Sequence, residues 1–211
     1  EPEAENDTGE TGENDILNVT AANGVLANDS DPDGDDLSVT EFTNGTDTAA
    51  AGGTIAGNEG GSFTLNTDGS YTFTPGTDFD DLAVGESRTT SVNYTVSDGE
   101  GGTDTATLTI TVNGANDAPT STAITGQSDA DADVITDFDV SGSFSDPDTN
   151  DTLVFSATGL PDGLTINPDT GVISGTINNS ASQGGPNNNG IYSVTVTATD
   201  PHNATTSQTF T

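Results

Sequence analysis

Residues 91–112, "SVNYTVSDGEGGTDTATLTITV", contain two segments in which apolar and polar residues alternate. This period of two predicts β-strands at 91–97 and 105–112, because successive side chains of a strand point to opposite faces. Gly and Asp residues separate the two segments, as expected of a turn. No part of the chain has a convincing helical period, so the sequence predicts an all-β protein.

The same alternation recurs along the rest of the chain. The turn "TDG" at 67–69 predicts a hairpin between two of the segments. Many short strands at this spacing indicate β-sandwiches, and both halves of the chain follow one plan. The further strands expected are 16–20, 37–42, 62–66 and 70–74 in the first half, and 139–144, 153–157, 164–166, 172–174, 192–198 and 206–211 in the second.

A length of 211 residues suits one large domain or two of about a hundred residues each. The short polar stretch "NGANDAPT" at 113–120, which is closed by proline, separates the two halves. We expect an acidic linker at 1–14, a domain at 15–113, a linker at 114–118 and a second domain at 119–211. The chain has no cysteine and no apolar run of transmembrane length, so neither disulfides nor direct membrane insertion are expected.

The chain is extremely acidic. Its formal net charge is −34, from 35 Asp and Glu residues against one Lys or Arg. Such a surface repels nucleic acid and anionic membranes and attracts cations. Acidity with only 29% hydrophobic residues would normally favour disorder. Because the apolar residues are strongly patterned, we expect folding that depends on neutralisation of the charge.

Aspartate is concentrated in short loops. The stretch "DSDPDGDD" at 29–36 has five aspartates in eight positions, and "SDPDTND" at 145–151 repeats its centre. Like charges so close together repel one another. An EF-hand is excluded, because counting from Asp29 places Thr40 at the twelfth position and a strand follows. For any single aspartate, a solvated turn residue or a salt-adapted surface remains an alternative interpretation.

Several stretches resemble two known families. Those of the first half resemble the cadherin-like repeat of large bacterial type I-secreted (RTX-type) adhesins, close to the VCBS repeat: 23–39, 69–86, 93–112 and 113–119. Those of the second half resemble the dystroglycan-type cadherin-like domain: 144–164, 166–177 and 192–200. The resemblance implies two tandem immunoglobulin-like, cadherin-like Greek-key β-sandwiches with calcium at the domain ends. Some dystroglycan-type domains are also associated with carbohydrate binding.

Calcium requires six to eight oxygen ligands, so one loop rarely supplies enough of them. The cadherin-like pattern implies a site where the chain enters the second domain, with these ligands: Asn116, Asp117, Asp146, Asp148 and Asp200. The loop 77–86 of the first domain is expected to complete that shell with Asp78, Asp80, Asp81 or Glu86. A second site is expected where the chain enters the first domain, from Asn14, Asp15, Asp31, Asp33, Asp98 and Asp104.

We therefore expect a calcium-rigidified segment of a secreted bacterial cell-surface adhesin, which extends or presents an adhesive region in cell adhesion and biofilms. Its expected partners are calcium ions (Ca²⁺) and neighbouring repeats, with glycans or another surface protein as further candidates, and the chain is expected to be monomeric. The alternative is a calcium-dependent, lectin-like carbohydrate-binding module, which binds glycans through calcium or through the polar loop 178–190. An enzyme is not expected, because the sequence suggests no nucleophile with a base, and His202 is interpreted as a surface residue.

Overall fold

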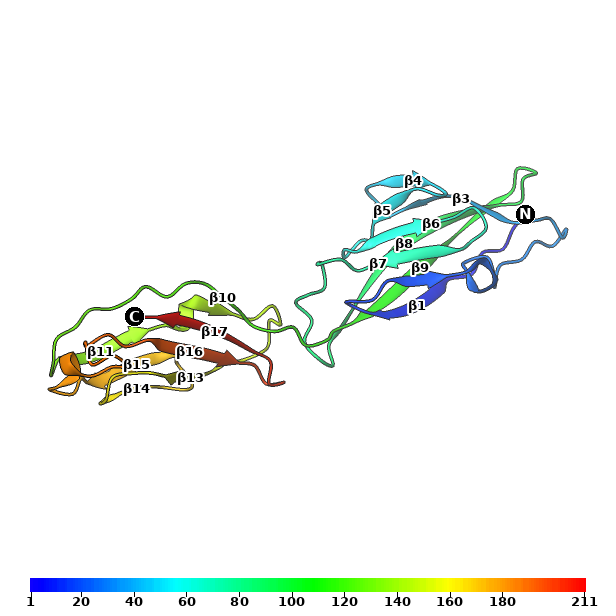
Figure 1. Ribbon diagram of the computed structural model, residues 1–211. Helices are drawn as coiled ribbons and strands as arrows, with labels where there is room; N and C mark the ends of the chain where they lie inside the picture. Colours follow the sequence, from blue (N-terminus) through cyan, green and yellow to red (C-terminus); the bar gives the residue numbers. More distant parts are fainter. The chain divides into compact units, whose positions relative to one another are not determined.

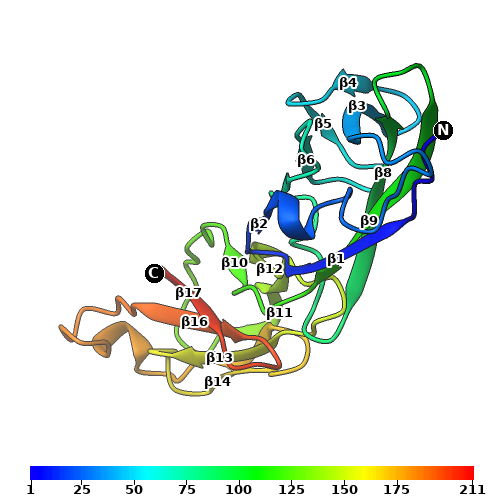
Figure 2. The same cartoon turned by 90° about the vertical axis from the view of Figure 1, so that its right-hand side faces the viewer.

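The computed structural model describes all 211 residues and divides the chain into two compact units. Unit 1 is Glu1–Ala115 and unit 2 is Asn116–Thr211, so the division falls inside the expected linker 114–118. Each unit is a β-sandwich, in agreement with the predicted all-β class (Figures 1 and 2). None of the short 3₁₀ turns has the length or the apolar composition needed to cross a membrane.

Unit 1 consists of a five-stranded sheet with the order β1-β9-β8-β3-β4 and a four-stranded sheet with the order β2-β7-β6-β5. The predicted hairpin is confirmed, because Leu65 of β6 pairs with Tyr71 of β7 across the turn. The elements of unit 1 are β1 (Asp7–Gly12), β2 (Leu17–Val19), the 3₁₀ turn η1 (Ala21–Asn23), β3 (Ser38–Thr43), β4 (Thr48–Ala50), β5 (Thr54–Ala56), β6 (Ser62–Leu65), β7 (Tyr71–Thr74), β8 (Ser87–Ser97) and β9 (Thr103–Asn113).

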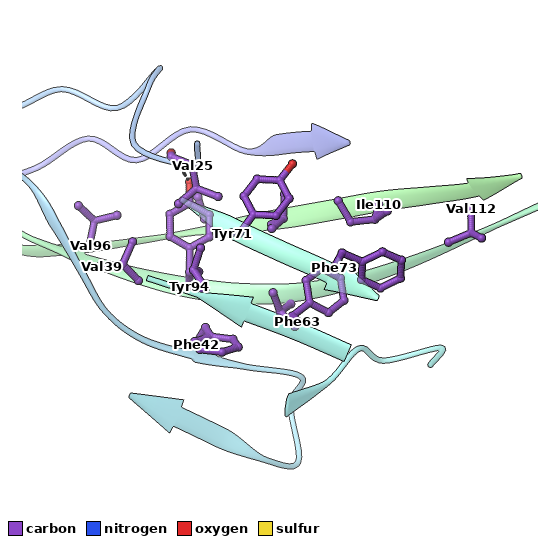
Figure 3. Packing of buried hydrophobic residues seen from close by; sticks show 14 of the residues in the cluster. Val25, Val39, Phe42, Phe63, Tyr71, Phe73, Tyr94, Val96, Ile110 and Val112 are labelled. Atoms are coloured by element: carbon purple, nitrogen blue, oxygen red, sulfur yellow. Dashed lines mark hydrogen bonds between the residues drawn. The ribbon is translucent and has the colours of Figure 1, made fainter. Parts of the chain in front are cut away.

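The core of unit 1 is built from the alternating apolar residues of these strands. Every second residue of β8 from Thr90 to Val96 is buried, and so is every second residue of β9 from Ala106 to Val112. Figure 3 shows Tyr94 of β8 and the rings of Phe63 and Phe73 pointing into the space between the sheets. Alternation therefore determines which face of each strand is buried.

The first residues do not form the expected acidic linker. Asp7–Gly12 are strand β1, which runs parallel to β9 from Leu108 to Asn113 and lies beside it in Figures 1 and 2. A Cβ atom on Gly9 would lie 2.7 Å from Cδ1 of Ile110, so a larger residue there would have to displace this buried side chain. The hydroxyl of Tyr94 also holds β1, by donating a 2.7 Å hydrogen bond to Oδ2 of Asp7. The prediction of a linker at 1–14 is thus wrong.

Unit 2 has two three-stranded sheets, β11-β15-β14 and β13-β16-β17, and the short pair β10-β12. Its core contains about half as many buried apolar residues as that of unit 1. The elements of unit 2 are β10 (Thr120–Ser121), β11 (Val134–Asp139), η2 (Ser141–Ser143), β12 (Phe144–Ser145), β13 (Val154–Thr158), β14 (Leu164–Ile166), β15 (Val172–Thr176), η3 (Ala181–Gln183), β16 (Val194–Thr199) and β17 (Thr205–Phe210).

One predicted strand of unit 2 is wrong. The stretch 139–144 contains the last residue of β11, the turn η2 and the first residue of β12. The reason is local, because Oδ1 of Asp139 accepts a 2.8 Å hydrogen bond from the N–H of Ser141 and turns the chain there. The other strands predicted in this half correspond to β13–β17 within two residues at each end.

Candidate metal centre

Three separate segments meet at one end of unit 2. Asn116 and Asp117 precede β10, the loop 146–151 follows β12, and Asp200 follows β16. Hydrogen bonds join them, because Nδ2 of Asn116 donates to Oδ2 of Asp200 at 2.9 Å, and the N–H of Asp117 donates to Oδ2 of Asp148 at 3.0 Å. The structure thus brings together the residues predicted for this end of unit 2.

Hydrogen bonds between aspartate side chains and nearby backbone N–H groups also stabilise each acidic loop. Oδ1 of Asp146 accepts a 3.1 Å hydrogen bond from the N–H of Asp148. Oδ1 of Asp200 accepts bonds of 2.8 and 2.9 Å from the N–H groups of His202 and Ala204. These turns use one carboxylate oxygen of Asp146 and of Asp200, so the other oxygen of Asp146 stays available for a different partner.

Four oxygens at this end are buried and accept no hydrogen bond: Oδ1 of Asn116, Oδ2 of Asp146, Oδ1 of Asp148 and Oδ2 of Asp151. Asp148 as a whole is only 1% exposed. A buried acceptor without a partner is costly, and a buried carboxylate without one costs more. A positively charged group close to these oxygens would offset this cost.

The pKa values of these carboxyls reflect the same crowding. Burial raises the pKa of both Asp146 and Asp148, and the carboxylates of Asp151 and Asp200 raise them further. Burial also acts to raise the pKa of Asp200, but the hydrogen bonds from Asn116 and from two backbone N–H groups outweigh it and lower that pKa. A cation at this end would favour the charged form of Asp146 and Asp148.

The chemistry of the donors suits a hard cation. All four orphaned atoms are carboxylate or amide oxygens, which calcium and magnesium prefer. The chain has no cysteine and one histidine, so the cysteine- and histidine-rich ligand set of most zinc sites is missing. Oδ2 of Asp151 also lies 3.7 Å from Nδ1 of that histidine, His202. As the side chains stand, no three His, Cys, Asp or Glu residues form a preassembled metal centre. The type and burial of the four oxygens suit calcium, whereas their spacing is not that of a formed site.

Asp151 was missed by the sequence reasoning. It belongs to the same "SDPDTND" stretch as Asp146 and Asp148, and its N–H donates to the carbonyl of Asp148 at 3.1 Å. The cadherin-like pattern draws attention to an Asp-x-Asp pair and not to a third aspartate three residues later. The aspartate-rich composition of the stretch is the signal that could have found it.

A second acidic cluster lies where the chain enters unit 1. The amino group of Glu1 is 3.4 Å from Oδ2 of Asp31 and 3.9 Å from Oδ2 of Asp33. Asp31, Asp33 and Asp98 thus lie near one another at this end of unit 1. Asp29, which was not predicted, contributes a further buried oxygen, Oδ2, that accepts no hydrogen bond.

The other residues predicted for this cluster differ in their roles. Asp104 lies there, but Oδ2 accepts a 2.8 Å bond from the N–H of Ala4. The prediction that Asn14 and Asp15 belong to this cluster is wrong. Both residues follow β1, which runs along β9 and ends at the opposite end of unit 1, where Gly12 pairs with Asn113. An 11-residue strand such as β9 spans about 35 Å, so they cannot share an ion with Asp31.

The loop 77–86 of unit 1 makes its own contacts. Oδ2 of Asp78 accepts a 2.8 Å bond from the N–H of Gly61, and Asp81 forms an ion pair with Arg88. Oε2 of Glu86 accepts a 3.2 Å bond from the N–H of Ala83. Asp80 was predicted as a ligand of the same ion site, and its contacts neither support nor oppose that role. The contribution of the loop 77–86 to the ion site at the start of unit 2 therefore stays a prediction.

Glu13 was also missed by the sequence reasoning. It is 1% exposed, and its Oε1 accepts a 2.9 Å hydrogen bond from the N–H of Ala115, the last residue of unit 1. The sequence "TGEND" offers little signal for it, because it was assigned to a linker. A buried carboxylate therefore holds the residue directly before Asn116.

Two protein-family models match the chain, one over each unit. Residues 1–114 match the family described as "Bacterial cadherin-like domain", which is more than half of the chain. The chain belongs to the bacterial cadherin-like family. Residues 118–211 match a second family, described as "Putative Ig domain". Both families consist of structural and adhesive modules and not of enzymes. No curated protein matches this cadherin-like chain.

Solved structures show the same fold in this cadherin-like chain. The crystal structure of human mucin-like protocadherin EC1-2 is 14% identical with a TM-score of 0.59, over 100% of this chain and 96% of that one. The mouse cadherin-23 EC22-24 structure is 13% identical with a TM-score of 0.52, over 99% and 61%. The human desmocollin-1 ectodomain is 15% identical with a TM-score of 0.48, and the chain spans 39% of it. The likeness to protocadherin and cadherin-23 supports the two tandem cadherin-like sandwiches.

Proposed function

We propose that this cadherin-like chain is a calcium-rigidified tandem module of a bacterial cell-surface adhesin. The observation that carries the proposal is the set of four buried oxygens that accept no hydrogen bond, at Asn116, Asp146, Asp148 and Asp151. Cadherin-like folds typically bind calcium, and cadherin-like and Ig-like domains are typical of extracellular adhesion modules. These two facts support the assignment of the oxygens to calcium.

The residues that would hold the ion also hold the linker. Asn116 and Asp117 bind directly to Asp200 and Asp148 of unit 2, and the preceding residue, Ala115, binds to Glu13 of unit 1. Three consecutive linker residues thus donate hydrogen bonds to acidic side chains. A bound calcium ion supplies the positive charge that lets these carboxylates lie close together. The consequence we propose is a linker whose motion stops when calcium is bound.

Rigidification is tested by small-angle X-ray scattering of the full chain in calcium and in chelator. We expect the distribution of interatomic distances to narrow when calcium is added, with little change in the secondary structure. Calorimetric titration of Asp148→Asn should show weakened ion binding, whereas Asp169→Asn, which changes an exposed turn residue by the same charge, should not. Scattering that is identical in calcium and chelator would contradict rigidification even if ions bind.

The place of the module in a longer protein is part of the same proposal. A stiff pair of domains would extend or present an adhesive region at the bacterial surface, for cell adhesion or biofilm formation, with neighbouring repeats as partners. The lectin-like alternative stays a prediction, and the loop 178–190 borders a groove that both polar and apolar residues line. A glycan array with and without chelator tests it.

A further inference from the structure

Unit 2 contains a groove of about 1020 Å³ that is separate from the acidic end. All five residues from Val134 to Phe138 of β11 line it. The register of β11 with β15 shifts between Ile135 and Phe138, and this irregularity lets consecutive residues of the strand reach the groove. β11 is the terminal strand of its sheet and pairs only with β15. Its other edge, next to the groove, has no strand partner.

The floor of this edge groove is apolar. Ile173, Ile177 and Val194 line it and are at most 7% exposed. Two large apolar side chains on its rim are strongly exposed, Val134 at 66% and Ile191 at 57%. Exposed aliphatic residues beside an open strand edge are features that proteins usually avoid, because they favour pairing with another chain.

The rim of the edge groove is acidic. Asp129, Asp131 and Asp137 line it, and Asp129 and Asp137 are exposed. Both oxygens of Asp131 are used by Ser182, whose N–H and hydroxyl donate to it at 2.7 and 2.6 Å. Unit 2 contains neither Lys nor Arg, so no basic side chain of its own can neutralise this rim. A basic segment of another molecule would complement this rim.

We propose that the edge groove binds an extended peptide segment of a partner protein in which basic and apolar residues alternate. The segment adds to the free edge of β11 as a further strand, so its main chain pairs with Val134–Asp139. Its apolar side chains enter the groove, and its Lys or Arg residues lie beside Asp129 and Asp137. None of these residues belongs to the candidate ion site, so this inference is independent of calcium binding.

The test uses the full chain and fluorescein-labelled seven-residue peptides in an anisotropy titration. The probe alternates lysine and valine. One control peptide replaces valine with serine at the same charge, and the other replaces lysine with glutamate. We expect saturable binding of the lysine–valine peptide, at least tenfold weaker binding of the lysine–serine peptide, and none of the glutamate–valine peptide. Hydrogen exchange should slow at the amides of residues 134–139 when the probe binds.

Two matched variants separate the groove from general attraction to an acidic protein. Val134→Asp adds a negative charge on the rim, and Val154→Asp adds one at a 51% exposed valine on β13 that does not line the groove. A purely electrostatic interaction would strengthen equally in both. We expect Val134→Asp to weaken probe binding about tenfold and Val154→Asp to leave it unchanged. Equal responses, or equal binding of the lysine–serine peptide, would overturn the proposal. So would glycan-array hits that Val134→Asp alone abolishes, because they would assign the groove to saccharides.

Discussion

Replacing Asp148 with asparagine should remove much of the calcium-dependent stability of unit 2 while preserving its calcium-free fold. Asp148 is 1% exposed, and its Oδ2 accepts the N–H of Asp117, a bond that an asparagine oxygen can also accept. The substitution removes one of the charges that raise the pKa of Asp146. The calcium-free variant should therefore be at least as stable as the parent protein.

The expected magnitude follows from linkage. Extracellular calcium modules bind at about 10⁻⁴–10⁻³ M, so about 10 mM calcium is a hundredfold excess for the tighter sites. One site then adds about 2.7 kcal/mol to the free energy of unfolding. For a domain of this size each kcal/mol moves Tm by about 4–8 °C, so we expect a rise of about 10–20 °C. If the lost charge weakens binding tenfold, about 1.4 kcal/mol of this disappears.

The assay is differential scanning calorimetry of the full chain in calcium and in chelator, with magnesium absent. Asp169→Asn is the matched control, because Asp169 is exposed in the turn between β14 and β15 and the change in net charge is the same. We expect the control to keep the full rise in Tm and Asp148→Asn to lose about half of it. The reasoning is refuted if both variants respond alike, or if calcium leaves the Tm of the parent protein unchanged.

Three further predictions concern unit 1. Burial and the nearby charges of Asp7 and Asp104 raise the pKa of Asp29 to about 6, so the folded state takes up a proton that the unfolded state does not between about pH 6 and pH 4. In chelator, unit 1 should thus gain stability as the pH falls through this window, and urea unfolding of Asp29→Asn should show a smaller gain; parallel pH profiles would refute it. Tyr94→Phe removes the donor to Asp7 and should cost about 1–3 kcal/mol in urea unfolding, so an unchanged midpoint would argue against that bond. Gly24→Ala places a Cβ atom 2.1 Å from the carbonyl oxygen of Gly69 and should lower the free energy of unfolding by about 1–3 kcal/mol, and a neutral effect on Tm would show that the backbone can move away.

Strands with a buried face could be predicted from the sequence, and strands without one could not. The segments around Val92–Val96 and Leu108–Val112 alternate because one face of each is buried in the core of unit 1. β1 shows no apolar alternation, since Asp7–Gly12 is held by backbone pairing with β9 and by the close approach of Gly9. β11 was missed for a similar reason, because most of its residues are exposed.

The candidate ion site was predictable to the extent that short motifs carry it. The resemblance to the cadherin-like pattern, carried by "SDPDT" and "AND", implied that Asp146, Asp148 and Asn116 belong together, and the fold brings them to one end of unit 2. Asn14 and Asp15 were misplaced because their position depends on β1, which moves them by the length of a strand. A short motif thus predicts the local conformation of its loop. The end of the domain at which the loop lies depends on the pairing of the neighbouring strands, and the motif holds no information about that pairing.

The single arginine has a practical consequence. Trypsin-like proteases cleave after lysine or arginine, so the bond that follows Arg88 is the only one in the 211 residues that they can recognise. That bond lies inside β8, where Arg88 pairs with Val112 of β9 and its guanidinium group is held by Asp81. A protease can reach it only after the strand has detached, so the rate of digestion follows the opening of unit 1. Unit 2 contains no Lys or Arg, so trypsin does not cleave it. The rate of limited trypsinolysis therefore reports the opening of unit 1 alone, without a label and in the presence of unit 2.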